Sequence, residues 1–287
     1  MIGIALALLS AFSFGLSQIL VRKKLDKSNY VHISLTVTIM GNIVLWPLAI
    51  LFTDFTEFNP TGLLLFIIAG ALAPAISRLF YFKGMQTAGL STNATVFSTY
   101  PIYTTTCAVL LLGETLTTPD WVGLAFILLG VIFVGKSINN NQTAIGNSKT
   151  RLIPPVIGSL AIASSQILRK EALNIYNQPL LGVAVGYATS LLVYFVILRF
   201  IKTDQKYTTK TLQAFWKPGI GIGIGWLLSF LALSQTNVSI VAPLLQTELL
   251  FILLFSYIFI RKIEKLTPKL VVSALLIISG VILISIN

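Results

Sequence analysis

The sequence predicts an all-α membrane protein with ten transmembrane helices, arranged as two inverted five-helix repeats. Composition is the first reason: the 287-residue chain is 55% hydrophobic and only 10% charged, whereas soluble domains carry about 25% charged residues. The second reason is an internal repeat, because the phrase "SQIL" stands at residues 17–20 and again at 165–168. The third is the grouping of Lys and Arg between apolar runs, which is typical of membrane loops.

Ten apolar stretches are close to the roughly 20 residues that a helix needs to cross a bilayer. A helix satisfies its backbone hydrogen bonds within one segment, so it is the expected form in lipid. The first stretch, "MIGIALALLS", lacks the basic start of a secretory signal and is interpreted as a retained membrane helix. The polar segments 22–29 and 53–60 end the first two helices, and short turns join the third to the fourth and the eighth to the ninth. The predicted helices span residues 2–21, 30–52, 61–83, 91–112, 119–135, 153–169, 179–201, 217–236, 240–260 and 268–286.

The orientation follows from the basic residues, which tend to remain on the cytoplasmic side of a membrane. With the first residue outside, the outer side keeps only Arg169 and Lys170, and Arg78 lies within a span. Both termini are therefore predicted to be extracytoplasmic in the cell (plasma) membrane. The 17 basic residues placed inside are Arg22, Lys23, Lys24, Lys27, Lys83, Lys136, Lys149, Arg151, Arg199, Lys202, Lys206, Lys210, Lys217, Arg261, Lys262, Lys265 and Lys269.

The internal repeat extends over most of the chain. At the offset of 148 residues set by "SQIL", "GMQTAGLSTNA" (84–94) aligns with "ALSQTNVSIVA" (232–242), and at an offset of 150 "ETLTTPDWVGLAFILLGVI" (114–132) aligns with "EKLTPKLVVSALLIISGVI" (264–282). Each copy holds five helices, an odd number, so the second copy enters the membrane inverted. This divides the chain into a first repeat (1–136), a polar Asn-rich linker (137–151) and a second repeat (152–287). Inverted repeats around a central site are common in secondary transporters.

Two motifs connect this pattern to a known family. A proline-containing fourth helix, "STYPIYTTTCAVLLLGETLT" (98–117), and the closing "ETL-T...LLGVIFV" resemble the EamA family of the drug/metabolite transporter superfamily. The resemblance implies a ten-helix transporter whose third, fourth, eighth and ninth helices, with parts of the first and sixth, surround a central cavity. It also implies export of amino acids or other small metabolites. The second copy departs from the first in having "QTELLFIL" (246–253) opposite "STYPIYTT" (98–105), so that Glu248 falls opposite Tyr100.

Glu248 is the first candidate for a functional group, because an ionisable residue within a membrane span is costly. It lies eight residues into the predicted ninth helix, about 12 Å along its axis, with no basic residue near it in sequence. A carboxyl group at that depth is protonated, paired across helices or facing a water-filled cavity. The first and last of these suit a proton carrier or a binder of a cationic group, and the structural alternative is a neutral side chain bonded to a neighbouring helix.

Arg78 is the second candidate. It follows Pro74 by four residues, and the proline should free the carbonyl group of Gly70 and kink the helix. Arg78 either faces the cavity or snorkels toward the cytoplasmic interface near Lys83. Its repeat equivalent is Trp226, which indicates that the side chain at this position has a binding partner in both halves.

Further candidates follow from polar spacing and from the repeat. Asn93 and Tyr100 belong to a polar stripe on the fourth helix, Tyr81 and Ser229 are repeat partners, and interhelical packing is an open alternative for the two glutamines of "SQIL". The full set of predicted substrate-binding residues is Arg78, Glu248, Tyr81, Tyr100, Trp226, Ser229, Gln18, Gln166 and Asn93.

Together these features predict a secondary transporter, and an exporter, of a small polar metabolite, with amino acids as the best single class. The alternative substrate is an organic cation or drug-like compound held by Glu248 and aromatic rings. A membrane-embedded enzyme is less favoured, because His32 is the single histidine and no nucleophile–histidine–acid set occurs. We expect no cofactor, coupling to protons, a small-molecule substrate and the lipid bilayer as partners, and no nucleic acid. The sequence is compatible with a monomer but does not determine the oligomeric state.

Overall fold

The computed structural model describes residues 1–25, 28–56, 58–88, 93, 96–139, 149–200, 207–259 and 268–285. Every regular element within these ranges is helical, so the all-α prediction is confirmed there. The elements are α1 (Ile2–Arg22), α2 (Tyr30–Phe52), α3 (Pro60–Gly70), η2 (Ala71–Ile76), α4 (Ser77–Thr87), α6 (Tyr100–Leu111), α7 (Thr118–Asn139), η3 (Lys149–Leu152), α8 (Ile153–Ile175), α9 (Pro179–Phe200), α10 (Thr209–Gln235), α11 (Val238–Leu245), α12 (Glu248–Phe259) and α13 (Pro268–Ser285).

These helices have the length and composition of membrane spans. Large apolar side chains such as Leu51, Leu110 and Phe200 are exposed on the outside of the bundle, where lipid would cover them. The chain is therefore a multi-pass membrane protein. Six helical segments are long and apolar enough to cross a bilayer, and they are Ile2–Arg22, Tyr30–Phe52, Pro60–Thr87, Thr150–Ile175, Pro179–Phe200 and Thr209–Gln235. Shorter apolar segments are Thr118–Phe133, Val238–Ile252 and Val272–Ile284.

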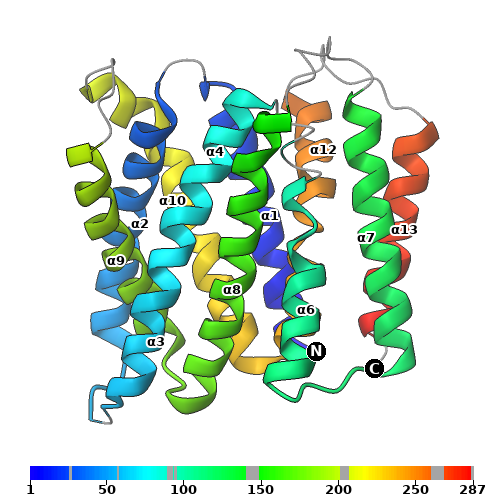
Figure 1. Cartoon of the computed structure of the whole chain (residues 1–287), viewed down its shortest axis with the longest axis horizontal. Coiled ribbons are helices and arrows are strands. Elements are labelled where there is room, and N and C mark those ends of the chain that lie inside the picture. Colours follow the sequence, from blue (N-terminus) through cyan, green and yellow to red (C-terminus); the bar gives the residue numbers. More distant parts are fainter. Residues whose placement is uncertain are drawn as a thin grey trace.

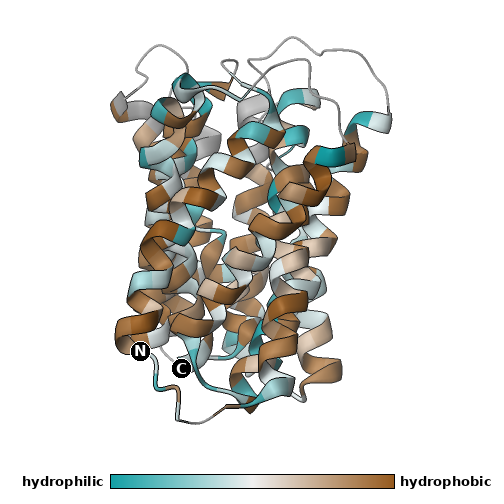
Figure 2. Ribbon diagram, turned by 90° about the vertical axis from the view of Figure 1, so that its left-hand side faces the viewer, coloured by the Kyte–Doolittle hydropathy of each residue, from teal (hydrophilic) through white to brown (hydrophobic). Residues whose placement is uncertain are grey.

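The helices stand side by side with both termini at the same end of the bundle (Figure 1). Helices α2 and α9 form one edge and α7 and α13 the other. Seen from the side, hydrophobic residues cover most of the height of the bundle and hydrophilic ones gather toward its ends (Figure 2). Two halves of five predicted spans give an even total of ten. An even number of spans returns the chain to its starting side, in agreement with termini that lie together.

Several predicted helix boundaries were too tight, and two of them by six residues or more. Helix α8 continues to Ile175 rather than ending at residue 169, and α10 begins at Thr209 rather than at 217. In both cases the prediction stopped the helix at charged residues, whereas backbone hydrogen bonding continues through them. As a result, Arg169 is not on an outer loop as predicted but lies fully buried within α8.

Two predicted spans are interrupted. The third is divided into α3 and α4 by a kink in the segment η2, because Ala73 adopts extended dihedral angles (φ −148°, ψ 132°) before Pro74. The ninth is divided into α11 and α12 by a turn, so Glu248 begins a helix instead of lying in the middle of one. Most of residues 89–95 at the start of the predicted fourth helix lie outside the described residues, and α6 begins only at Tyr100.

The interruption at Ala73 leaves carbonyl groups without helical partners, and side chains from α8 and α9 donate hydrogen bonds to them. The predicted release of the Gly70 carbonyl by Pro74 is confirmed, since that carbonyl group accepts from a serine of α9. Satisfied carbonyls allow an irregular backbone at membrane depth. The donors and acceptors are Ser165 Oγ to Ala69 (2.8 Å), Ser190 Oγ to Gly70 (3.0 Å), Tyr194 OH to Ala75 (2.8 Å) and Arg169 Nη2 to Ala73.

The halves of the chain pack on each other in a reciprocal pattern. Helix α1 packs against α10, and α8 packs against α3 and α4. Helix α2 packs against α9, and α7 packs against α13. Glycines bring α7 and α13 close together: a Cβ at Gly130 would lie 2.6 Å from Ile277 Cγ1, and one at Gly280 would lie 2.7 Å from Ile127 Cγ1. Ile277 and Gly280 lie 150 residues beyond Ile127 and Gly130, so they are their repeat equivalents. The contact of Gly130 with Ile277 is therefore repeated, with the halves interchanged, as the contact of Gly280 with Ile127.

Candidate functional site

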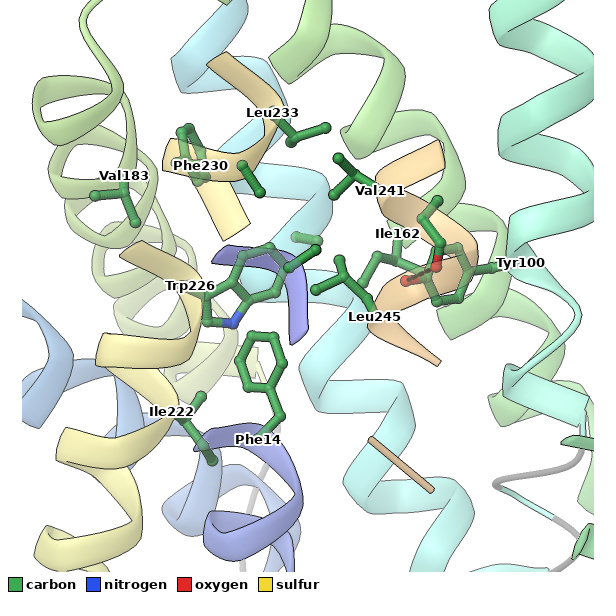
Figure 3. Packing of buried hydrophobic residues seen from close by; sticks show 14 of the residues in the cluster. Phe14, Tyr100, Ile162, Val183, Ile222, Trp226, Phe230, Leu233, Val241 and Leu245 are labelled. Atoms are coloured by element: carbon green, nitrogen blue, oxygen red, sulfur yellow. Dashed lines mark hydrogen bonds between the residues drawn. The ribbon is translucent and has the colours of Figure 1, made fainter. Parts of the chain in front are cut away.

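A cavity opens between helices of both halves. About 90 Å³ of it is accessible to the centres of water molecules, and one water needs about 10–15 Å³ by this measure, so the cavity has room for a small metabolite. In Figure 3 the rings of Phe14 and Trp226 lie beside each other, with Leu245 next to them and Ile162 and Tyr100 beyond it. The lining residues are Phe14, Gln18, Ser77, Arg78, Tyr81, Phe82, Phe97, Ser98, Tyr100, Ile162, Gln166, Ile222, Trp226, Ser229, Leu245, Gln246, Glu248 and Leu249.

Most of the predicted site residues meet at this cavity. Asn93 does not line it: its buried side chain lies against Gly84 of α4, so the predicted polar stripe on the fourth helix does not extend into the site from this position. The predicted residues that do line the cavity are Gln18, Arg78, Tyr81, Tyr100, Gln166, Trp226, Ser229 and Glu248.

Arg78 turns into the bundle and does not snorkel toward the membrane interface near Lys83. Only 7% of its surface is exposed. Its guanidinium donates from Nη1 to Thr38 Oγ1 and from Nη2 to Tyr187 OH, both at 2.8 Å, and lies 5.0 Å from the centroid of the Tyr187 ring. These contacts with α2 and α9 hold a fixed positive charge at one wall of the cavity.

Glu248 borders the cavity at the start of α12, immediately after the turn at Gln246 and Thr247. Its side chain is partly exposed, and Tyr81 and Tyr100 are its electrostatic neighbours. A helix N-terminus favours a negative charge, which gives the carboxylate some stabilisation without a basic partner. No salt bridge joins Glu248 to Arg78 within the described part of the chain, so the two groups are separate poles of one cavity.

Several polar atoms at the cavity have no hydrogen-bond partner in the protein as described. The amide group of Gln166 is completely buried, and it approaches the Tyr100 hydroxyl without reaching hydrogen-bond geometry. Buried polar atoms are nearly always paired, so these atoms are free to bond with water or with a polar ligand in the cavity. The unpaired atoms are Gln18 Oε1, Gln166 Oε1 and Nε2, Ser229 Oγ and Gln246 Nε2.

Sequence reasoning missed Arg169, which was assigned to an outer loop. Its guanidinium lies 4.1 Å from the centroid of the Trp226 ring and 5.1 Å from that of Phe230. Helical spacing was the available signal, because Arg169 lies one turn beyond Gln166 and so shares its face of α8. Hydropathy concealed it, because the predicted sixth helix ended at residue 169 and so placed Arg169 at a membrane edge.

The sequence repeat relates most of the lining residues to one another. Lining residues recur at the offset of 148, as in Phe14 with Ile162 and Ser98 with Gln246. Fourteen of the 18 lining residues form seven such pairs. The other pairs are Gln18 with Gln166, Arg78 with Trp226, Tyr81 with Ser229, Phe97 with Leu245 and Tyr100 with Glu248. Sequence reasoning predicted both members of four pairs and neither member of the other three, so the offset alone could not have located the missed ones.

Within the described ranges, no group of three or more His, Cys, Asp or Glu side chains is placed to hold a metal ion. Glu114, between α6 and α7, accepts from the backbone N–H groups of Val238 and Ser239 at 2.9 Å. It therefore caps α11 of the other half, a structural role at the edge of the bundle.

Comparison with known proteins identifies the family. The model of the EamA-like transporter family matches residues 1–136 and 153–286. The chain belongs to the EamA-like transporter family. The expected resemblance is thus confirmed, and the family to which the chain belongs is one of membrane transporters.

A structural comparison gives the same fold for this EamA-like chain. A solved crystal structure of a protein superposes with a TM-score of 0.78, covering 99% of this chain and 98% of the other at 12% sequence identity. No curated protein matches the chain in sequence. At such low identity the structural match establishes the fold alone, so substrate and mechanism depend on the cavity itself.

Proposed function

We propose that this EamA-like protein is a secondary transporter, and an exporter, of a small polar metabolite, with amino acids as the substrate class. The main support for this proposal is the cavity between the halves, which has room for a small molecule and is lined by unpaired polar atoms. Transport would proceed by alternating access, with the two halves rocking around this cavity.

The proposed mechanism needs two inverted repeats, 1–136 and 152–287, joined by the linker 137–151. Two findings support them. Seven pairs of equivalent residues, one from each half, line the same cavity. The contact of Gly130 with Ile277 between α7 and α13 is repeated by their equivalents, Gly280 and Ile127. Both are what a two-fold axis through the cavity would produce, because an isologous contact always occurs twice with its partners exchanged.

An amino acid would use both poles of the cavity. Its carboxylate would bind at Arg78, where a guanidinium can form two parallel hydrogen bonds, and its ammonium group would lie near Glu248 and the surrounding aromatic rings. Because Thr38 and Tyr187 accept hydrogen bonds from Arg78, its guanidinium is already in position before the substrate binds. Such preorganisation lowers the entropic cost of binding.

An organic cation is the second candidate substrate. The observation that favours it is the aromatic cluster beside Glu248, where the Tyr81 and Phe97 ring centroids are 4.7 Å apart and those of Phe97 and Tyr100 are 5.9 Å apart. Aromatic faces attract cations. The positive charge of Arg78 on the same cavity opposes this substrate, and we therefore rank it second.

Transport is proposed to be coupled to protons. Glu248 is the candidate proton carrier, because it is the carboxyl group among the lining residues. The protein would lie in the plasma membrane as a monomer with both termini extracytoplasmic, so that the ends of the helices rich in Lys and Arg face the cytoplasm.

The test is uptake of labelled amino acids into everted vesicles that contain the wild-type chain or the Arg78→Lys variant. Lysine keeps the charge but loses the bidentate fork, so the variant should transport about tenfold less or worse. Lys217→Gln is the control, because Lys217 is exposed and outside the cavity. Undiminished transport by Arg78→Lys would eliminate the carboxylate clamp, and absence of amino-acid uptake by the wild type would eliminate the substrate class.

A further inference from the structure

Two arginines adjoin the cavity, and the described residues offer neither of them a carboxylate partner. Arg78 lines the cavity and Arg169 lies behind Trp226, which also lines it. The two guanidinium groups are close enough to interact electrostatically with each other. Burying one unpaired charge is expensive, and two of the same sign also repel each other.

Arg169 is the less expected of the two, because it is completely buried. Its Nη2 donates to the carbonyl group of Ala73, but Nε and Nη1 have no partner in the described structure. The remaining contacts of the guanidinium are with the rings of Trp226 and Phe230. None of these partners carries a negative charge.

Support of the helix break at Ala73 does not explain the charge of Arg169. Three neutral hydroxyl donors, from Ser165, Ser190 and Tyr194, already serve the carbonyl groups around the same break. A neutral amide or hydroxyl on α8 would serve Ala73 in the same way without the cost of a buried charge. The charge therefore requires another reason.

The charges around the cavity supply that reason. Arg78 and Arg169 contribute two positive charges, and Glu248 contributes one negative charge or none, so the sum is positive whether or not Glu248 is protonated. A neutral zwitterion leaves this excess in place. A ligand with two carboxylates removes it, with one ammonium group if Glu248 is ionised and without one if Glu248 is protonated.

We propose that the substrate is a small dicarboxylate, either an acidic amino acid or a simple diacid, and that Arg169 selects its negative charge. Arg169 acts across the indole ring of Trp226, in low-dielectric surroundings where Coulomb interactions are strong. This inference rests on the proposed transport function and changes its substrate class from amino acids in general to small dicarboxylates, acidic amino acids among them. It makes Arg169 a specificity-determining residue that need not contact the substrate.

The first test uses the wild-type chain in proteoliposomes, with labelled aspartate, succinate, alanine and putrescine as probes. We expect aspartate or succinate to be transported at least about tenfold better than alanine, and putrescine not to be transported. Preference for aspartate over succinate would identify an ionised Glu248, and the reverse a protonated one. Equal or better transport of alanine or putrescine would overturn this inference and leave transport itself intact. Failure of all four probes would overturn both proposals.

The second test changes the charge of Arg169. Arg169→Gln keeps an amide donor for Ala73 but removes the charge, so the ratio of aspartate to alanine transport should fall about tenfold. Arg169→Lys should retain the preference. Lys217→Gln is the matched control, since Lys217 lies 5.4 Å from the ring of Trp216 on the same helix as Trp226 but is exposed.

Thermal unfolding of each purified variant separates loss of folding from loss of selectivity. If Arg169→Gln does not fold, the comparison rests on Arg169→Lys and the wild-type probe series. An unchanged aspartate preference in folded Arg169→Gln would refute the assignment of Arg169.

Discussion

Substitution of Gly70 by alanine tests the close approach of α3 and α9 at the helix break. A Cβ at Gly70 would lie 2.5 Å from Gly186 Cα and 2.6 Å from the Gly186 carbonyl oxygen, whereas ordinary contact begins at 3.4 Å. The two backbones must therefore separate by about 0.9 Å (3.4 minus 2.5). The hydrogen bond from Ser190 Oγ to the Gly70 carbonyl, now 3.0 Å long, would be lost at that separation.

The free energy follows from three contributions. Overpacking costs about 1–3 kcal/mol, the lost hydrogen bond about 0.5–1.5 kcal/mol, and the better helix propensity of alanine returns up to about 1 kcal/mol. We expect Gly70→Ala to destabilise the protein by about 0.5–4.5 kcal/mol, the range spanned by these contributions. The measurement is the thermal unfolding midpoint of detergent-purified protein, followed by tryptophan fluorescence, and it should fall by several degrees.

The facing glycine is the control. A Cβ at Gly186 would come no closer than 3.6 Å to Gly70 Cα, so Gly186→Ala should leave the midpoint unchanged or slightly raised. Equal midpoints for Gly70→Ala and Gly186→Ala would refute the reasoning, because they would show that the backbones at this crossing adjust freely.

Three further predictions address the carboxyl groups and the topology. Glu248→Gln should fold normally but lose the pH dependence of transport, measured as uptake against external pH; a retained pH profile would reduce Glu248 to interhelical packing. Glu114→Ala should lower the unfolding midpoint by the equivalent of about 1–3 kcal/mol, because the N–H groups of Val238 and Ser239 lose their acceptor, whereas a midpoint equal to that of the wild type would contradict the capping role. A C-terminal alkaline phosphatase fusion should be active and a green fluorescent protein fusion dark, and the opposite pair of signals would reverse the orientation.

The sequence already contained most of the cavity. The repeat starting at Gln18 and Gln166 matched equivalent positions, and positions that are equivalent about a two-fold axis converge on the same central space. Eight of the nine predicted site residues therefore line one cavity. Asn93 is the exception, because spacing along a helix defines a face only when the helix is continuous, and α6 begins later, at Tyr100.

Hydropathy by itself determined that the chain is a helical membrane protein, because lipid accepts only long apolar segments that satisfy their own backbone. It did not determine where buried charges lie. Arg169 is stabilised by Ala73, 96 residues earlier in the chain, and by the ring of Trp226, and no local pattern encodes such partners. The break at Ala73 likewise depends on donors from α8 and α9. Only the tertiary structure decides these features, since an irregular backbone or a charge survives in the membrane only where other helices supply its partners.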